Sequence, residues 1–227
     1  MNYLKKINLM KLFNIFSLLN LLFILSKYLL KTRRYLNLFI LIILYRPKKI
    51  LEIGVYNGVR SSEMISVAKI FNNNIVYYGF DLFEEFYKKK NLLKNELSKK
   101  PLLKNQIYKK LSTLTKVKLY KGYTHKTLHS FVKNNKNLID FIFIDGGHSI
   151  QTIKNDWKFV KKIMHKNTVV VFDDYYLNDK KIIKKFGCNF LKTELKKKYE
   201  MSLLPFTDKF AIKNGYRYIK MIKVKNV

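Results

Sequence analysis

The amino-acid sequence predicts an α/β protein with a mainly parallel sheet of seven strands, helices on both faces and an antiparallel strand pair that closes the sheet. Three observations lead to this prediction. From Pro47 onward, runs rich in β-branched and aromatic residues alternate with segments of helical spacing. The first run leads into a glycine turn, and two further strand-like runs follow the last predicted helix. Strands that alternate with helices are joined by right-handed crossovers, so the sheet should be mostly parallel.

The predicted elements follow one another through residues 46–227 without a linker that would divide them into two domains. Strands are expected at residues 49–54, 75–81, 117–120, 139–145 and 168–174, and helices at 61–71, 124–133 and 149–164. Residues 199–204 and 216–224 should form the closing antiparallel pair, with a loop between them. Residues 82–115 are a lysine-rich, mostly helical insertion, which we expect to act as a cap over the substrate.

The first 45 residues are predicted to form an apolar, amphipathic helical extension. Residues 12–26 and 35–45 carry no charge, but neither run reaches the roughly 20 apolar residues that a membrane-spanning helix needs. We expect helices that pack on the sheet or on a partner subunit of a homo-oligomer. The alternative is attachment to a membrane surface, helped by Lys5, Lys6 and Lys11. In both cases the extension should be dispensable for cofactor binding.

The composition indicates a folded protein with a basic surface. A hydrophobic content of 48% and an aromatic content of 15% exclude a disordered chain. The net charge of +31 suggests nucleic acid as a partner, but only five of the 46 basic residues are arginine, the residue that nucleic-acid surfaces favour. We therefore interpret the lysines as a solvated coat and do not expect nucleic acid as a partner. The single Cys188 fits a cytoplasmic location, either free or at the inner face of a membrane.

Two features at the ends of neighbouring strands indicate a nucleoside cofactor. In an open parallel sheet, ligands bind outside the carboxyl ends of the strands. Gly54 and Gly58 form a tight turn after the first strand, and Asp81 ends the second, where a carboxylate can accept hydrogen bonds from a ribose diol. A dinucleotide site would need a second glycine at position 56, where this chain has Tyr56.

These residues resemble a known family. Residues 51–58 (LEIGVYNG) resemble the first motif of class I S-adenosylmethionine-dependent methyltransferases, which have a Rossmann-like fold, and residues 80–81 (FD) resemble the acidic second motif. Residues 144–149 (IDGGHS), followed by Asp156, resemble the macrolide-sugar (macrocin-type) metal-dependent O-methyltransferases. The resemblance covers about residues 48–175. It implies S-adenosylmethionine as cofactor, in contact with a set of seven residues: Glu52, Gly54, Tyr56, Gly58, Asp81, Tyr123 and Asp145.

The individual roles in this set also come from the family. Glu52 and Gly54 would lie by the methionine portion of the cofactor, and Asp81 would hold the ribose hydroxyls. Tyr123 would approach the adenine, at a position where family members often carry an acidic or amide residue. This chain therefore departs from the family pattern at Tyr123.

A second group of polar residues follows the fourth and fifth strands. Asp145, Asp173 and Asp174 should meet at one edge of the sheet, and three carboxylates suit a cation such as Mg²⁺. The family resemblance implies the same ligands and gives His148, with Asp145, a catalytic role: the imidazole takes the proton of a hydroxyl that becomes the nucleophile. The alternative is structural, with an aspartate capping a helix and His148 in a turn. Methyl transfer without metal is then the expected mechanism.

The predicted function is methyl transfer from S-adenosylmethionine to a hydroxyl of a sugar, a glycan or another small molecule, with assistance from Mg²⁺. Two alternatives use the same fold. One is an RNA or protein methyltransferase that uses the basic surface, for which arginine clusters or a recognition domain would be expected. The other is a non-catalytic, membrane-associated binding module. The glycine turn, Asp81 and the carboxylates favour an enzyme over the last alternative.

Overall fold

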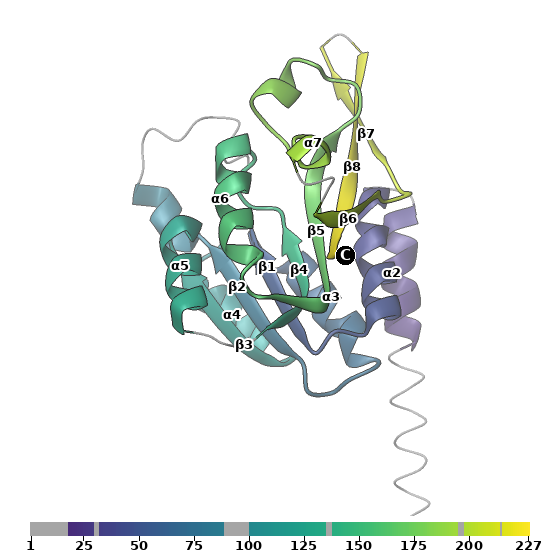
Figure 1. The fold of residues 1–227 in the computed structure, drawn as a ribbon. Helices are drawn as coiled ribbons and strands as arrows, with labels where there is room; N and C mark the ends of the chain where they lie inside the picture. The colour runs from purple at the N-terminus through teal and green to yellow at the C-terminus, as the bar shows by residue number, and fades with distance from the viewer. Residues whose placement is uncertain (1–17, 30–31, 89–99, 135–137, 195–197, 214) are drawn as a thin grey trace, which may run out of the picture.

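The central feature of the structure, a computed structural model, is one sheet of eight strands in the order β3-β2-β1-β4-β5-β8-β6, with β7 paired to β8 (Figure 1). The structure describes residues 18–29, 32–88, 100–134, 138–194, 198–213 and 215–227. The parallel strands are β1 (Lys49–Ile53), β2 (Val76–Asp81), β3 (Lys116–Lys121), β4 (Ile139–Ile144) and β5 (Met164–Tyr176). The antiparallel strands are β6 (Tyr199–Leu203), β7 (Asp208–Ile212) and β8 (Gly215–Asn226). The α/β class and the closing antiparallel pair are confirmed.

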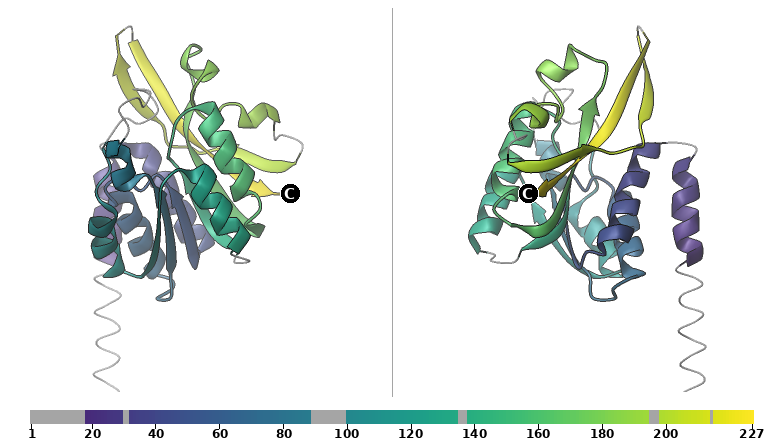
Figure 2. Two further views of the ribbon diagram at one scale, coloured as in Figure 1. Left: turned by 90° about the vertical axis from the view of Figure 1, so that its left-hand side faces the viewer. Right: turned by 45° about the vertical axis from the view of Figure 1, so that its right-hand side comes forward.

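Helices cover both faces of the sheet (Figures 1 and 2). One face carries α2 (Leu36–Tyr45), α3 (Val59–Lys69) and α4 (Lys104–Ser112); the other carries α5 (Thr124–Asn134) and α6 (Ile150–Val160). Each face has its own hydrophobic core. Because side chains alternate along a strand, Ile50 of β1 lies in the core under α2, α3 and α4, whereas Leu51 and Ile53 lie in the core under α5 and α6. The described chain also contains shorter helices: η1 (Arg33–Tyr35), η2 (Phe83–Lys88), η3 (Ile182–Lys184) and α7 (Leu191–Glu194).

One strand was not predicted. The sequence predicts a loop between the closing strands, but Asp208–Ile212 form β7, which pairs antiparallel with β8 over Gly215–Ile219. The last four residues of β7 are exposed, so the segment lacks the apolar run that marks a buried strand. The predicted count of seven strands is therefore corrected to eight.

The predicted insertion contains an ordinary crossover helix. Within residues 82–115, α4 joins β2 to β3, and Ile107 and Leu111 are fully buried in the core shared with α3. Helix α4 is thus part of the packed fold. That residues 82–115 form a cap over the substrate stays a prediction, and residues 89–99 of this segment lie outside the described residues.

The amino-terminal segment packs on the sheet. Leu38, Phe39 and Ile42 of α2 are fully buried in the same core as β1 and β4, so this helix packs on the sheet as expected. The helical residues 18–29 lie beside α2 (Figure 2), and their outward side chains include Leu22 and Phe23, which are 54% and 69% exposed. Among the described residues, no helix combines the length and apolar character needed to cross a membrane. Contact with a membrane surface or a partner subunit stays a prediction.

Replacing a buried side chain of α2 tests how much this packing stabilises the fold. We expect Phe39→Ala to lower the free energy of unfolding by about 3–5 kcal/mol, because the lost ring leaves a cavity in the core. Its neighbour Ile40 is 38% exposed, and Ile40→Ala is the matched control, expected to cost less than about 1 kcal/mol. Urea denaturation followed by circular dichroism measures both. Equal and small effects would mean that α2 contributes little to the stability of the fold.

Candidate active site

The turn after β1 brings two strand ends unusually close together. Gly54 has φ +95°, and a Cβ atom there would lie 2.0 Å from the carbonyl oxygen of Asp145, so only glycine fits. Gly58 has φ +67° and precedes α3, and a Cβ atom there would lie 3.2 Å from Ile107 of α4. The predicted glycine turn is therefore present, and it places the backbone after β1 directly against Asp145, the residue that follows β4.

Asp81 holds this turn from the neighbouring strand. The backbone N–H of Tyr56 donates to Asp81 Oδ2 at 2.7 Å, and the N–H of Phe83 donates to Oδ1 at 3.1 Å. Burial raises the pKa of Asp81, and the hydrogen bonds from the backbone partly offset this effect. The side chain of Tyr56 is 37% exposed beside it. The carboxylate thus lies next to the glycine turn, as predicted.

Glu52 faces the interior of the protein. Its carboxyl accepts hydrogen bonds from Ser61 of α3 and from Tyr77 of β2, and Oε1 has no hydrogen-bond partner among the described residues. Burial raises the pKa of Glu52 to about 8, against the opposing effect of the two hydrogen bonds. Glu52 is only 1% exposed and contacts both helix α3 and strand β2, and its contact with a cofactor stays a prediction.

The loop after β3 lies beside the end of β2. The N–H of Gly122 donates to the carbonyl of Asp81 at 2.9 Å, and Gly122 has φ +121°. The ring of Tyr123 follows and lies 5.5 Å from the ring of His125. The structure therefore brings Tyr123 to the same sheet edge as Asp81, where the sequence predicts it.

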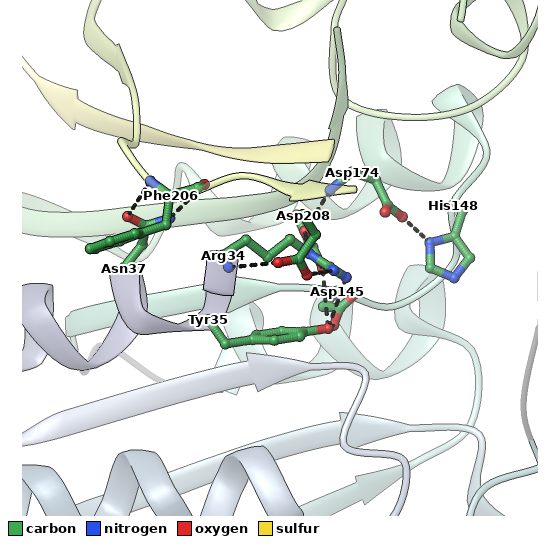
Figure 3. A network of polar contacts seen from close by, with 9 residues as sticks. Arg34, Tyr35, Asn37, Asp145, His148, Asp174, Phe206 and Asp208 are labelled. Carbon is green, nitrogen blue, oxygen red and sulfur yellow. Dashed lines mark hydrogen bonds and ion pairs between the residues drawn. The ribbon is translucent and has the colours of Figure 1, made fainter. Parts of the chain in front are cut away.

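A histidine and an aspartate form a direct pair at this edge. Nδ1 of His148 is hydrogen-bonded to Asp174 Oδ2 (Figure 3), and Nε2 points away from that carboxylate. The next residue, Ser149, caps α6 by accepting from the N–H of Thr152, which fixes the position of the loop that carries His148. Asp145, His148 and Asp174 each offer a ligand atom within 4.8 Å of the others.

The charges in this cluster shift its acid–base properties. Burial lowers the pKa of His148, but the hydrogen bond to Asp174 and the nearby carboxylates outweigh it and raise the value to about 9. For Asp174, burial opposes ionisation, yet the pairing with His148 lowers its pKa. Burial and the charges of Asp173 and Asp174 raise the pKa of Asp145 well above its ordinary range. His148 is thus a stronger base than the sequence suggests.

Asp173 does not join this group. It is bound by Arg34, whose Nε lies 2.8 Å from Asp173 Oδ1 and whose Nη2 lies 2.9 Å from Oδ2. Consecutive residues of a strand face opposite sides of the sheet. Asp173 therefore points to the face that carries α2, whereas Asp174 points to the other face and contacts His148, which lies just before α6. Among the described residues, the side chains close enough to share one metal are those of Asp145, His148 and Asp174, without Asp173.

A family comparison agrees with this geometry. Residues 51–175 match a family described as a methyltransferase domain. This chain belongs to that family. The matched segment begins at β1 and ends within β5, so it contains Gly54, Asp81, Asp145, His148 and Asp174.

Individual relatives of this methyltransferase are distant. An uncharacterized protein of Acanthamoeba polyphaga mimivirus is 30% identical over 125 residues, which are 55% of this chain and 50% of that protein. The chain thus spans about half the length of the curated relative that it matches. The O-methyltransferase TomG from Streptomyces achromogenes, solved with S-adenosylmethionine, shares 16% identity and a TM-score of 0.55, covering 86% of this chain and 80% of TomG. An O-methyltransferase from Bacillus cereus, solved with S-adenosylhomocysteine, shares 16% identity and a TM-score of 0.53. The match covers 92% of this chain and 90% of that enzyme.

Three residues of the site were missed by the sequence interpretation. Arg34 and Tyr35 come from η1, and the Tyr35 hydroxyl lies 3.5 Å from Asp145 Oδ2 and 3.4 Å from Asp173 Oδ2. Asp208 of β7 accepts from the backbone N–H of Arg34 at 3.0 Å and from its guanidinium. One signal was available: arginine is rare in this lysine-rich chain, and Arg34 stands between two apolar runs.

The ionisation of His148 can be measured directly. We expect its imidazole to titrate with a midpoint near pH 9 in the protein without ligands, because Asp174 stabilises the protonated ring. Asp174→Asn removes that negative charge and should lower the midpoint. Nuclear magnetic resonance of the ring measures both, with the signal identified by its loss in His148→Ala. A midpoint below about 6.5, the ordinary value for histidine, would contradict the described pair.

Proposed function

We propose that the chain transfers a methyl group from S-adenosylmethionine to a hydroxyl of a sugar, a glycan or another small molecule. The observation that carries this proposal is the His148–Asp174 pair beside Asp145, at the edge of the sheet where the glycine turn and Asp81 also lie. A histidine oriented by a carboxylate is the arrangement that removes a proton from a hydroxyl nucleophile. The O-methyltransferases among the structural neighbours support the same reaction class.

The residues around the turn fit S-adenosylmethionine. Gly54 and Gly58 themselves place no side chain at the turn, and Asp81 offers carboxylate oxygens for the ribose hydroxyls. Tyr123 follows Gly122, whose N–H donates to the carbonyl of Asp81, and in this proposal it approaches the adenine. Tyr56, in the turn itself, is 37% exposed. S-adenosylmethionine supplies an electrophilic methyl group on a sulfonium. Its solved complexes with TomG, and those of its product with the Bacillus cereus enzyme, support this choice.

The His148–Asp174 pair is suited to deprotonate the acceptor. Asp174 holds Nδ1, which leaves Nε2 of His148 to take the proton of the acceptor hydroxyl. The acceptor oxygen then forms a bond to the methyl carbon as the carbon–sulfur bond breaks, which leaves a neutral thioether. Asp145 offers a ligand atom within 4.8 Å of those of His148 and Asp174, so it lies beside the proposed base. Because the pKa of His148 is about 9, the neutral base becomes more abundant as the pH rises from 7 to 9.

The basic surface gives little support to an RNA substrate. In the described part of the chain, every arginine already has an intramolecular contact: Arg33 with the Leu29 carbonyl, Arg34 with Asp173, Arg46 with Phe71, Arg60 with Glu63 and Arg217 with Asp179. Arginine provides the bidentate and stacking contacts that nucleic-acid sites favour. The observations therefore favour a small acceptor over RNA.

Loss of Asp81 tests the cofactor assignment. We expect Asp81→Ala to weaken the binding of S-adenosylmethionine by about 2–3 kcal/mol, because hydrogen bonds to a charged group are lost. Asp81→Asn keeps one acceptor oxygen for the N–H of Tyr56 and should retain part of the affinity. Isothermal titration calorimetry measures the dissociation constants. Unchanged affinity in a folded Asp81→Ala protein would show that Asp81 does not hold the ribose.

Loss of His148 tests the reaction. His148→Ala should lower kcat by about 10²–10⁴-fold while the affinity for S-adenosylmethionine stays within about twofold, because only proton transfer is lost. His165 is the matched control: it pairs with Asp140 at 3.0 Å, near the start of β4 and thus at the opposite edge of the sheet. His165→Ala should retain full activity. Release of S-adenosylhomocysteine with a panel of sugar and phenol acceptors gives the rates, and equal rates for the two variants would refute the role of His148.

A further inference from the structure

The carboxylate that the sequence assigns to a divalent cation is already bound to an arginine. Nε of Arg34 lies 2.8 Å from Asp173 Oδ1 and 3.1 Å from Oδ2, and Nη2 lies 2.9 Å from Oδ2. Both residues are buried, with exposed fractions of 8% and 3%. A guanidinium that engages both oxygens of a carboxylate forms one of the stronger ion pairs in proteins. The predicted ligand set of Asp145, Asp173 and Asp174 is therefore incomplete.

Arg34 is fixed in this position by a second carboxylate. Its backbone N–H donates to Asp208 Oδ1 at 3.0 Å, and Nη1 donates to Asp208 Oδ2. The guanidinium stays protonated at every pH at which the protein is folded, since its pKa is raised further by Asp173 and Tyr35 against the effect of burial. A divalent cation placed at Asp173 would meet this fixed positive charge at close range, where a buried environment screens repulsion weakly.

The ligand atoms that remain are engaged as well. Nδ1 of His148 is bonded to Asp174, so a cation held by both residues would have to break that bond. The side of Asp145 that faces α2 is lined by Tyr35, whose hydroxyl accepts from Arg34 Nη2 at 3.0 Å and lies 3.5 Å from Asp145 Oδ2. The guanidinium of Arg60 lies 3.8 Å from the centre of the Tyr35 ring. Positive charge near Asp145 thus comes from the chain itself.

We propose that Arg34 takes the place of the divalent cation in this site. The guanidinium is a permanent internal counter-ion for Asp173 and Asp208, and it orients the Tyr35 hydroxyl toward Asp145. The cluster of Asp145, His148, Asp173 and Asp174 then binds neither Mg²⁺ nor Mn²⁺, and cofactor binding needs no metal. The metal-binding part of this proposal stands on the geometry alone, whereas independence of methyl transfer from metal rests on the proposed function.

Titration with Mn²⁺ tests the proposal without an assay of activity. The free Mn²⁺ signal in electron paramagnetic resonance is followed as metal-free protein is added, for the wild type, Arg34→Met and Arg217→Met. Arg217 binds Asp179 through Nε at 3.0 Å and Nη2 at 2.7 Å, outside the cluster, and is the matched control. We expect no saturable site in the wild type or in Arg217→Met. Arg34→Met, which frees Asp173, should bind Mn²⁺ at least about tenfold more tightly, because repulsion is replaced by an additional ligand.

Two results would overturn the proposal. The first is stoichiometric Mn²⁺ binding by the wild type that Asp145→Asn abolishes. The second is a folded Arg34→Met protein with the same Mn²⁺ affinity as the wild type, since Arg34 would then not be what keeps the cation out. If circular dichroism shows that Arg34→Met is unfolded, Arg34→Lys retains a positive charge and should stay free of Mn²⁺, and the wild-type titration still decides. Failure to transfer methyl groups would refute the proposed function and leave the Mn²⁺ result intact.

Discussion

The guanidinium of Arg34 joins three segments of the chain that lie far apart in the sequence. Its partners Asp173 and Asp208 are 139 and 174 residues away, on β5 and β7. Removing one partner of a buried ion pair leaves an uncompensated charge, which costs about 3–5 kcal/mol. The amino-terminal helices therefore cannot leave the sheet without exposing two buried carboxylates. This constraint holds η1 against the edge where the candidate active site lies, and it connects the β7–β8 hairpin to the same point.

The alternation of side chains along β5 gives two neighbouring aspartates different tasks. Asp173 faces the α2 side and neutralises Arg34, whereas Asp174 faces the α6 side and orients His148. Asp174 has φ +59°, and the pairing of β5 with β8 shifts register between Phe172 and Tyr175. The strand therefore bends where the site begins. The guanidinium of Arg34 therefore lies on one face of the sheet, and the proposed base, His148, lies on the other.

Much of this architecture can be predicted from the sequence because its signals are local. The apolar runs of β1, β2, β4 and β5 are strong, and the carboxyl ends of parallel strands necessarily meet at one edge. For this reason Asp81, Asp145 and His148 lie where they were expected. The position of Glu52 could also have been predicted, since it shares a strand face with Ile50, a core residue beneath α3.

The remaining features depend on contacts that no local pattern encodes. An apolar run such as 35–45 fits a helix on the sheet, a helix on a partner subunit or a surface anchor, and only the assembled sheet shows that α2 is buried. The pairing of Arg34 with Asp173 and Asp208 is equally long-range. Asp173, which the sequence suggests as a ligand of a metal cation, therefore binds an arginine in the fold. Strand β7 escaped prediction because most of its residues are exposed.

We propose that this methyltransferase domain binds S-adenosylmethionine at the ends of β1 and β2 and needs no divalent metal to do so. Calorimetric titration of the full chain with S-adenosylmethionine and S-adenosylhomocysteine, in a chelator and then in Mg²⁺, tests this claim most directly. We expect saturable binding of one cofactor per chain, with the same dissociation constant in both buffers. Binding that appears only with Mg²⁺, or no binding in either buffer, would contradict it.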